Sequence, residues 1–341
     1  MLKRWVGVAL ALMLVTGGLG FSAQAEEEAA SSESGLDLGL RTNAAAMPAK
    51  AADGSVMEAP ASHMLLLDYD TGAVLAEKAA DQKMYPSSMT KIMTLYIVFD
   101  RLKQGTLALN NQFTVSEKAW RMQGSKMFVP IGEQVSLEDL IRGISIQSGN
   151  DACVALAEGI AGSEDAFAKQ MNDTAKKLGM LNTNFTDSSG WPDPENTTTP
   201  QDLAKLGEAL IRDFPYYYHY LSEREFTYHG IRQFNRNLLL GNPSLKVDGI
   251  KTGHTEAAGY GITLSAVDPV TSRRLVLVLN GLDSEAARAQ EGERLLKWGF
   301  ANFNNADAFT PGKEIVKAPV WMGAAREVGL LAPGLHVERH P

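Results

Sequence analysis

Ser88 and Lys91 stand three residues apart in YPSSMTKIMTLYIVFD, where a helical pattern begins. Residues three apart share one face of a helix, so the lysine amine can reach the serine hydroxyl. A serine hydroxyl is a weak nucleophile until a base removes its proton, and a lysine can be that base when burial or nearby positive charge lowers its pKa. The same spacing also suits a capping serine followed by a solvated lysine, so this segment alone allows both interpretations.

A second motif, Ser148-Gly149-Asn150 in QSGND, falls between two helical patterns and is therefore predicted to form a loop. On such a loop the Ser148 hydroxyl could relay a proton. The Asn150 amide could hold a substrate carbonyl. Taken alone, the motif is far more typical of an ordinary turn than of a catalytic loop.

A third motif, Lys251-Thr252-Gly253 in DGIKTGHTEAAGY, lies on a predicted strand. Gly253 has no side chain, so a substrate peptide could approach the strand edge and pair with its backbone. Lys251 would supply positive charge that helps to keep Lys91 deprotonated and attracts an anionic substrate terminus. Taken alone, this motif is equally typical of an exposed strand.

Local patterns predict the elements that position these motifs. HMLLLDYDTGAVLAEK has two apolar runs around a turn and predicts a β-hairpin, whereas SMTKIMTLYIVFDRLKQG has helical spacing. Ser136 and Asp139 in SLEDLIRGISI have the spacing of a helix cap, and NDACVALAEGIAG and EDAFAKQMNDTAKKLGM predict further helices. SSGWPDPENTTTP is rich in turn residues and predicts a loop.

The sequence pattern changes from helical to strand-like in the last third of the chain. VDGIKTG, GYGITLSAV and RRLVLVLNG are short and β-branched, and SEAARAQEGERLLKWGFANF then predicts a closing helix. A hairpin, several helices, strands and a final helix indicate an α+β fold. We expect an antiparallel sheet whose terminal strands lie side by side, covered by helices and joined to a helical subdomain.

Composition excludes several classes of function. The net charge of -8 argues against a nucleic-acid-binding protein, which usually carries a basic patch. The single cysteine, Cys153, rules out an intrachain disulfide and lies on an apolar helical pattern, where we expect it to be buried. The six histidines lack metal-ligand spacing and no phosphate-binding loop motif occurs, so we expect neither a metal nor a cofactor.

The N-terminus has the pattern of an export signal. Lys3 and Arg4 precede a short apolar run, and AQA follows at residues 23–25, which predicts a signal peptide over 1–25 cleaved after Ala25. The alternative is an uncleaved anchor, but the run is short for a membrane span. Residues 26–60 are rich in Ala, Glu, Ser and Gly and predict a flexible linker. We therefore expect a mature protein that is periplasmic or otherwise extracytoplasmic.

The three motifs in this order are the signature of β-lactamases and penicillin-binding proteins. Over about residues 62–303 the sequence resembles the low-molecular-weight penicillin-binding proteins of the D-alanyl-D-alanine carboxypeptidase type. Long segments carry the resemblance: PSSMTKIMT, GSKMFVPIGEQVSLEDLIRGISIQSGNDACVALAE, EFTYHGIRQFNRNLLL and VDGIKTGHTEAAGY. The resemblance implies a β-lactamase/transpeptidase-like fold and a serine peptidase domain over 61–303.

The resemblance also implies roles for individual residues. Ser88 matches the acylated nucleophile and Lys91 its base, while Ser148 and Asn150 match the second catalytic motif. The backbone N–H groups of Ser88 and His254 match the oxyanion hole, which stabilises the developing negative charge. The matched substrate-binding positions are Lys251, Thr252, Gly253 and Arg288. For Arg288, a solvated helix arginine is the alternative interpretation.

The implied function is a serine-type D-Ala-D-Ala carboxypeptidase that acts on peptidoglycan stem peptides and is acylated by β-lactam antibiotics. Three alternatives stay open: a peptidoglycan endopeptidase, a weak β-lactamase, or a non-catalytic β-lactam sensor. Glu195 is not placed where β-lactamases carry their deacylating base, which weakens the β-lactamase alternative.

The last residues depart from the family pattern. The family commonly has a second, β-rich domain followed by an amphipathic membrane helix. Residues 304–341, with PGKEIVKAPVWMG, resemble the start of that domain, and we expect no membrane anchor in this chain. We also expect this segment to contribute little to catalysis, because all three motifs lie upstream of it.

Overall fold

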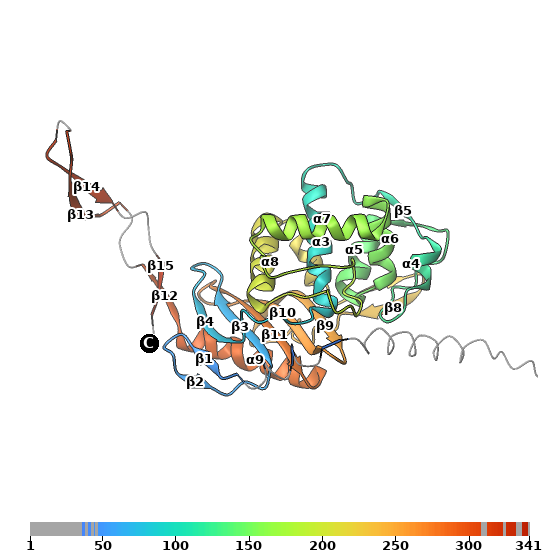
Figure 1. The fold of residues 1–341 in the computed structure, drawn as a ribbon, viewed down its shortest axis with the longest axis horizontal. Coiled ribbons are helices and arrows are strands. Elements are labelled where there is room, and N and C mark those ends of the chain that lie inside the picture. Colours follow the sequence, from blue (N-terminus) through green and yellow to red (C-terminus); the bar gives the residue numbers. More distant parts are fainter. Residues whose placement is uncertain are drawn as a thin grey trace, which may run out of the picture.

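The computed structural model describes residues 36–37, 40–41, 44, 47–307, 312–322, 325–331 and 336–339. Its largest feature is a seven-stranded antiparallel sheet in the order β2-β1-β4-β3-β11-β10-β9, with a group of helices on one face and α9 on the other (Figure 1). The sheet strands are β1 (Ala49–Ala51), β2 (Val56–Met57), β3 (His63–Asp68), β4 (Val74–Lys78), β9 (Lys246–Thr255), β10 (Gly259–Val267) and β11 (Arg274–Leu282). The predicted α+β class and the adjacency of the early and late strands are confirmed, since β3 pairs with β11.

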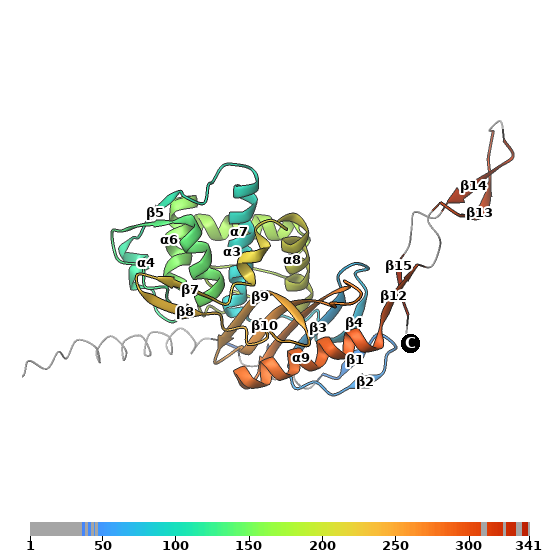
Figure 2. The same cartoon turned by 180° about the vertical axis from the view of Figure 1, so that it is seen from behind.

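The helices gather mainly in one subdomain above the sheet, and α9 closes the opposite face (Figure 2). They are η1 (Ser87–Thr90), α3 (Lys91–Lys103), α4 (Glu117–Arg121), α5 (Leu137–Arg142), η2 (Gly143–Gln147), α6 (Asn150–Ala161), α7 (Glu164–Lys177), α8 (Pro200–Asp213), η3 (Tyr218–Leu221) and α9 (Glu285–Asn302). The predicted cap of α5 is confirmed, because the Ser136 hydroxyl accepts a hydrogen bond from the Asp139 N–H at 3.1 Å. Two small hairpins complete this region: β5 (Gln112–Thr114) with β6 (Gln134–Ser136), and β7 (Glu225–Tyr228) with β8 (Ile231–Phe234).

The central strands are buried on both faces, which explains their nearly continuous apolar sequences. On β11, Val276 and Val278 pack into the core shared with the helical subdomain. Leu275 and Leu277 point the other way, into a second core that includes Leu295 of α9. The sheet therefore packs against one core on each face. These two cores also fix the position of its edge strand β9.

The prediction of a flexible linker over 26–60 is wrong for residues 49–57. These residues form β1 and β2, and β1 pairs with β4 in the register Lys50↔Glu77 and Ala51↔Ala76. Strands of three and two residues are too short to show a periodic sequence pattern, so only the pairing partner identifies them. The sheet therefore begins at Ala49 rather than near residue 61. The predicted signal peptide over 1–25 lies outside the described residues.

The described parts of 304–341 form strands, as expected for the start of a β-rich segment. They are β12 (Asn304–Asp307) paired with β15 (His336–Arg339), and β13 (Glu314–Pro319) paired with β14 (Glu327–Leu331). Both pairs extend away from the main sheet (Figures 1 and 2). None of the helices in the described ranges is long and apolar enough to cross a membrane.

Candidate active site

Ser88 and Lys91 meet where η1 passes into α3. Ser88 lies in η1, and Lys91 is the first residue of α3 and has no exposed surface. The Lys91 Nζ lies 2.9 Å from Ser88 Oγ, 2.7 Å from Asn150 Oδ1 and 2.6 Å from the Ser189 carbonyl oxygen. Neither residue fits the alternative interpretation, because η1 has no side-chain cap and the lysine is not solvated.

Lys91 Nζ can donate in all three contacts. A neutral amine fits the same positions when the Ser88 hydroxyl turns to donate to it. The Asn150 and Ser189 oxygens can only accept hydrogen bonds, whereas the Ser88 hydroxyl can also donate one. An uncharged lysine has two N–H donors for the two oxygens and one lone pair that can receive the serine proton. Burial lowers the pKa of Lys91, and the positive charge of Arg236 lowers it further. Ser88 and Lys91 therefore have the geometry of a nucleophile and its base.

Asn150 contacts the base itself, in addition to the substrate contact that the motif predicts. Its Oδ1 accepts from Lys91, and its Nδ2 donates to the Gln123 carbonyl oxygen at 2.8 Å. The amide thus orients the base, and one of its two N–H groups is already engaged by the protein. The sequence predicted an amide directed at a substrate carbonyl and did not reveal this link to Lys91.

Ser148 adopts an unusual backbone conformation at the end of η2. Its φ of 66° lies in the left-handed region, which non-glycine residues seldom adopt. The residue is buried, and within the described chain its Oγ has no hydrogen-bond partner. A buried hydroxyl without a partner is rare in folded proteins and fits a group that engages a bound molecule.

Gly253 lies on the edge strand, but its missing side chain faces the protein. A Cβ at this position would lie 2.9 Å from the Pro86 carbonyl oxygen and 3.3 Å from the Ser87 Cβ. The glycine therefore lets β9 pack against the segment that carries Ser88. Its smallness thus brings the nucleophile and the strand together, and its role in substrate approach stays a prediction.

The same contact brings the two predicted oxyanion donors onto adjoining segments. The Ser88 N–H belongs to η1, the His254 N–H belongs to β9, and these two elements pack against each other. The His254 ring stacks on Tyr260 with ring centroids 3.9 Å apart. Partial burial, and then the nearby Arg288, lower the pKa of this histidine.

Positive side chains cluster at the other predicted positions. Lys251 and Thr252 are buried on β9, and the Lys251 Nζ donates to the Thr252 carbonyl oxygen at 3.0 Å. Burial and the charge of Lys91 lower the pKa of Lys251 well below its usual range. Arg288 is 3% exposed, and its guanidinium donates to the Arg236 carbonyl oxygen at 3.2 Å and the Gly253 carbonyl oxygen at 3.5 Å. Arg288 is therefore part of the site and is not a solvated helix arginine.

The sequence motifs did not identify the loop that supplies the third contact of Lys91. Asp187 Oδ1 accepts hydrogen bonds from the backbone N–H groups of Ser189 and Gly190 at 2.6 and 2.7 Å. This arrangement fixes the loop so that the Ser189 carbonyl points at the Lys91 amine. The sequence Asp-Ser-Ser-Gly is typical of such a turn, so the turn could have been predicted, but its proximity to Lys91 could not.

Arg236 is a second residue that the motifs missed. It lies between β8 and β9 and donates to the Ser125 hydroxyl at 2.7 Å. Its charge reaches both buried lysines, because it lowers the pKa of Lys91 and of Lys251. Its position depends on a turn that brings distant segments together, and no local pattern marks it.

Cys153 is fully buried, as predicted, and burial raises the pKa of its thiol to about 12. Over the described ranges, no cluster of three or more His, Cys, Asp or Glu side chains could hold a metal ion.

Comparison with known proteins agrees with this geometry. The family model described as D-alanyl-D-alanine carboxypeptidase matches residues 48–283. The carboxypeptidase DacC of Escherichia coli K12 is 44% identical over 292 residues, which cover 83% of this chain and 72% of that protein. The carboxypeptidase DacA of Haemophilus influenzae is 42% identical over 269 residues, which cover 78% of this chain and 68% of that protein.

Solved structures extend the similarity to three dimensions. Penicillin-binding protein 5 of Haemophilus influenzae superposes with a TM-score of 0.78 at 40% identity and covers 83% of each chain. Penicillin-binding protein D2 of Listeria monocytogenes, solved with ampicillin bound, has a TM-score of 0.64 at 27% identity. That match covers 70% of this chain and 97% of the Listeria chain.

Proposed function

The chain belongs to the D-alanyl-D-alanine carboxypeptidase family, and from this premise we propose that Ser88 is the residue that carries out the hydrolysis. The protein is a serine-type carboxypeptidase that releases the terminal D-alanine from a peptide ending in D-Ala-D-Ala. The observation that carries the assignment of Ser88 is the buried Lys91, whose amine lies 2.9 Å from Ser88 Oγ and is otherwise bound by acceptors alone.

The first half of the reaction forms an ester on Ser88. Lys91 takes the hydroxyl proton while Ser88 Oγ attacks the carbonyl between the two D-alanines. The backbone N–H groups of Ser88 and His254 stabilise the oxyanion of the tetrahedral intermediate. The amide bond then breaks, and Ser148 and Lys251 pass a proton to the nitrogen of the departing D-alanine.

The substrate's free C-terminus is the second recognition element. Thr252 and Arg288 hold the carboxylate of the leaving D-alanine, and the guanidinium of Arg236 lies close enough to influence the pKa of Arg288. A carboxylate at this point satisfies donors and reduces the mutual repulsion of the buried cations. Water then attacks the ester, with Lys91 again as the base, and releases the shortened peptide.

A β-lactam resembles the terminal dipeptide and acylates the same serine. Opening of the ring leaves the product attached to Ser88, where it hinders attack by water. The substrates proposed in the cell are peptidoglycan stem pentapeptides, reached outside the cytoplasmic membrane after export.

The decisive experiment is Ser88→Ala. We expect complete loss of D-alanine release from a synthetic peptide ending in D-Ala-D-Ala and complete loss of covalent labelling by a fluorescent penicillin. The circular dichroism spectrum should not change. Labelling that persists in the folded variant would contradict the assignment of Ser88. Mass spectrometry of the wild-type products separates a carboxypeptidase from an endopeptidase, which would cut a cross-bridge instead.

A further inference from the structure

A segment at the start of the described chain packs beside the catalytic residues and has no role in the mechanism so far. The family model matches residues 48–283 and therefore does not include this segment. We call residues 36–47 the N-terminal strap. Its described members are Leu36, Asp37, Leu40, Arg41, Ala44 and Met47.

The strap contacts the segment that leads to the nucleophile. Tyr85 lies three residues before Ser88 and is 6% exposed. Its phenolic oxygen accepts a hydrogen bond from the Asp37 backbone N–H at 2.8 Å. Its carbonyl oxygen accepts a hydrogen bond from Asn280 Nδ2 of β11 at 3.1 Å. Tyr85 is therefore held by the strap at its side chain and by the sheet at its backbone.

The apolar side chains of the strap bridge two segments of the site. Leu36 and Leu40 pack against a small buried cluster that consists of Tyr85, Ala257 and Ala258. The tyrosine precedes the nucleophile, and the two alanines belong to the turn between β9 and β10, just after the proposed oxyanion donor on β9. The strap therefore spans the two segments that carry the proposed oxyanion donors.

Arg41 adds polar contacts at the same end of the sheet. Its Nε donates to the Gly281 carbonyl oxygen at 3.2 Å, and its guanidinium forms an ion pair with Asp283 at 2.5 Å. A Cβ on Gly259 would lie 2.9 Å from Arg41 Cζ, so this glycine makes room for the guanidinium. Gly259 begins β10 and pairs with the last residue of β9. Arg41 therefore attaches the strap to the end of β11 and to the start of β10.

The backbone just before Ser88 is strained and depends on its surroundings. Ser87 has a φ of 48°, in the left-handed region that non-glycine residues seldom adopt. A residue keeps such a conformation only when the structure around it holds it there. The Ser87 hydroxyl donates to Thr255 Oγ1, at the end of β9, over 3.4 Å. The strained residue thus lies between the two places where the strap is attached, Tyr85 and the β9–β10 turn.

We propose that the N-terminal strap holds the backbone N–H groups of Ser88 and His254 at the spacing that the oxyanion requires. Leu40 and Arg41 are positioning residues, because they act through the segments that carry these donors. The inference rests on the proposed function, since it takes these two N–H groups as the oxyanion hole.

This role predicts a particular kinetic pattern. An oxyanion forms in the same hole during acylation of Ser88 and during hydrolysis of the acyl-enzyme, so displaced donors slow both steps alike. Interactions made only in the transition state affect kcat and leave ground-state binding unchanged. When both steps slow by one factor, kcat for D-alanine release falls by that factor and KM stays the same.

Leu40→Asp and Arg41→Met in the full chain test the proposal. Leu40→Asp puts a carboxylate against the apolar cluster, and we expect it to lower the acylation rate with penicillin and the rate of acyl-enzyme hydrolysis by a common factor of about ten. Removal of a whole oxyanion donor costs about a hundredfold or more, and here the donors are only displaced. Arg41→Met removes the ion pair with Asp283 and should lower both rates by about threefold, the scale of a partly exposed ion pair.

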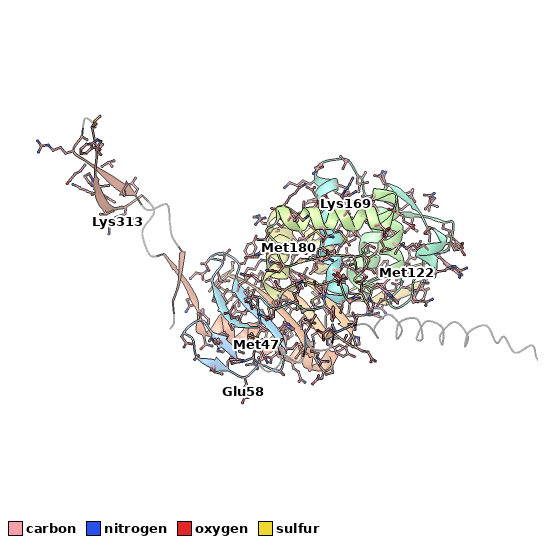
Figure 3. All side chains as sticks on the ribbon, in the orientation of Figure 1. Met47, Glu58, Met122, Lys169, Met180 and Lys313 are labelled. Atoms are coloured by element: carbon pink, nitrogen blue, oxygen red, sulfur yellow. The ribbon has the colours of Figure 1, made fainter. Side chains whose placement is uncertain are left out.

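Three control variants isolate the effect of the strap. Leu40→Met keeps the apolar contact and should retain the wild-type rates. Leu181→Asp repeats the aspartate substitution at a side chain that is 79% exposed, next to Met180 on the helical subdomain (Figure 3). Lys169→Met removes a positive charge from the exposed surface of α7 (Figure 3). Met180 and Lys169 both lie away from Met47 at the end of the strap, so neither of these two controls should alter kcat or KM.

The other outcomes identify what would be wrong. The pH midpoint of acylation should not move, because the hydrogen bonds of Lys91 involve no strap residue. A shifted midpoint would mean that the strap acts on the base, and a change in KM alone would mean that it acts on substrate access. Either result, faster turnover in Leu40→Asp, or wild-type rates in both strap variants would overturn the proposal. Arg41→Met decides the question by itself if Leu40→Asp does not fold.

The wild-type protein separates this proposal from the proposed function. Normal acylation by penicillin and normal D-alanine release in the wild type, with no common loss in the strap variants, would overturn the role of the strap alone. Absence of both reactions in the wild type would overturn the proposed function, and the role of the strap with it.

Discussion

Two regions of the molecule bury a positive side chain, and they surround it differently. Beside the start of β11, Arg273 is 6% exposed and donates to Asp68 Oδ2 at 2.6 Å, with further bonds to the carbonyl oxygens of Gly299 and Phe303. At the start of α3, Lys91 is equally buried, but its oxygen partners are an amide, a carbonyl and a hydroxyl. No described carboxylate forms an ion pair with it.

The carboxylate partner distinguishes a cation that stabilises the fold, Arg273, from one that can act as a base, Lys91. Burial by itself would raise the pKa of Asp68, but the hydrogen bonds from Arg273 and Thr71, together with the charge of Arg273, outweigh it and lower that pKa. Both groups of the pair therefore stay charged. Lys91 has no such partner, so burial and Arg236 lower its pKa and favour the neutral amine. A carboxylate at hydrogen-bonding distance would hold the proton on Lys91 and suppress the base.

We call the surroundings of Arg273 and Asp68 the paired region, and those of Lys91 the unpaired region. The largest effect on stability should come from removing the ion pair of the paired region. Asp68→Ala leaves the Arg273 guanidinium buried without its counter-charge, a change that typically costs about 3 to 5 kcal/mol. We expect the free energy of unfolding in urea to fall by that amount. Turnover per folded molecule should stay near the wild-type value, because the pair is remote from Ser88.

Asp68→Asn is the matched control, because it keeps an oxygen for Arg273 and removes only the charge. Its loss of stability should be smaller than that of Asp68→Ala. If both variants unfold like the wild type, the pair does not stabilise the fold and the contrast with Lys91 fails.

The unpaired region should show the reverse pattern. Lys91→Met removes the base and should slow acylation of Ser88 by penicillin at least about a hundredfold, the usual scale for a lost general base. The free energy of unfolding should change by no more than about 1 kcal/mol, since the lost hydrogen bonds are offset by the removal of a poorly solvated amine. Stopped-flow labelling and urea unfolding measure the two quantities on one sample. Near-normal acylation would show that another group deprotonates Ser88.

The pH dependence of acylation sharpens the same contrast. Because the pKa of Lys91 is lowered, the amine is neutral at pH values where a solvated lysine is still protonated. As the pH falls through that lowered pKa, Lys91 gains a proton and the acylation rate should decrease about tenfold per pH unit. The rate should level off at higher pH. A rate that rises as the pH falls would mean that the charged lysine is the active form.

The sequence predicted those parts of the molecule whose signal is local. The hairpin β3–β4, the cap of α5 and strands β9 to β11 each follow from periodicity and turn residues within one segment. The triplets in their order, supported by the long matching segments, identified Ser88, Lys91 and the residues of β9. All of these groups lie at or beside the site in the structure.

The sequence did not reveal what each group contacts. Asn150 lies 59 positions from the lysine that it binds, and Ser189 acts through a backbone carbonyl, which every residue has. The sequence suggested that Gly253 lets a substrate approach the strand. Only the structure shows that the missing side chain also lets β9 pack closely on η1. Strands β1 and β2 are too short for a pattern. In each case the missing information is a contact between distant segments.

The smallest predicted effect concerns the segment after α9, in which Asn305 contacts the pair of Arg273 and Asp68. Asn305 Nδ2 donates to Asp68 Oδ1 at 3.3 Å, which adds one neutral donor to the carboxylate that holds Arg273. Asn305→Ala should therefore lower the free energy of unfolding by about 1 kcal/mol, the usual net value of one such bond. It should leave kcat/KM unchanged.

Removal of residues 304–341 should reproduce the small loss of stability expected for Asn305→Ala, because the described strands β13 and β14 pair with each other and not with the main sheet. The argument is that the catalytic groups depend on η1, α3, β9 and the loop 186–193, none of which pairs with this segment. Thermal unfolding and D-alanine release from one peptide are sufficient measurements. A shortened protein that unfolds normally but has lost turnover would show that this segment also supports the site around Lys91.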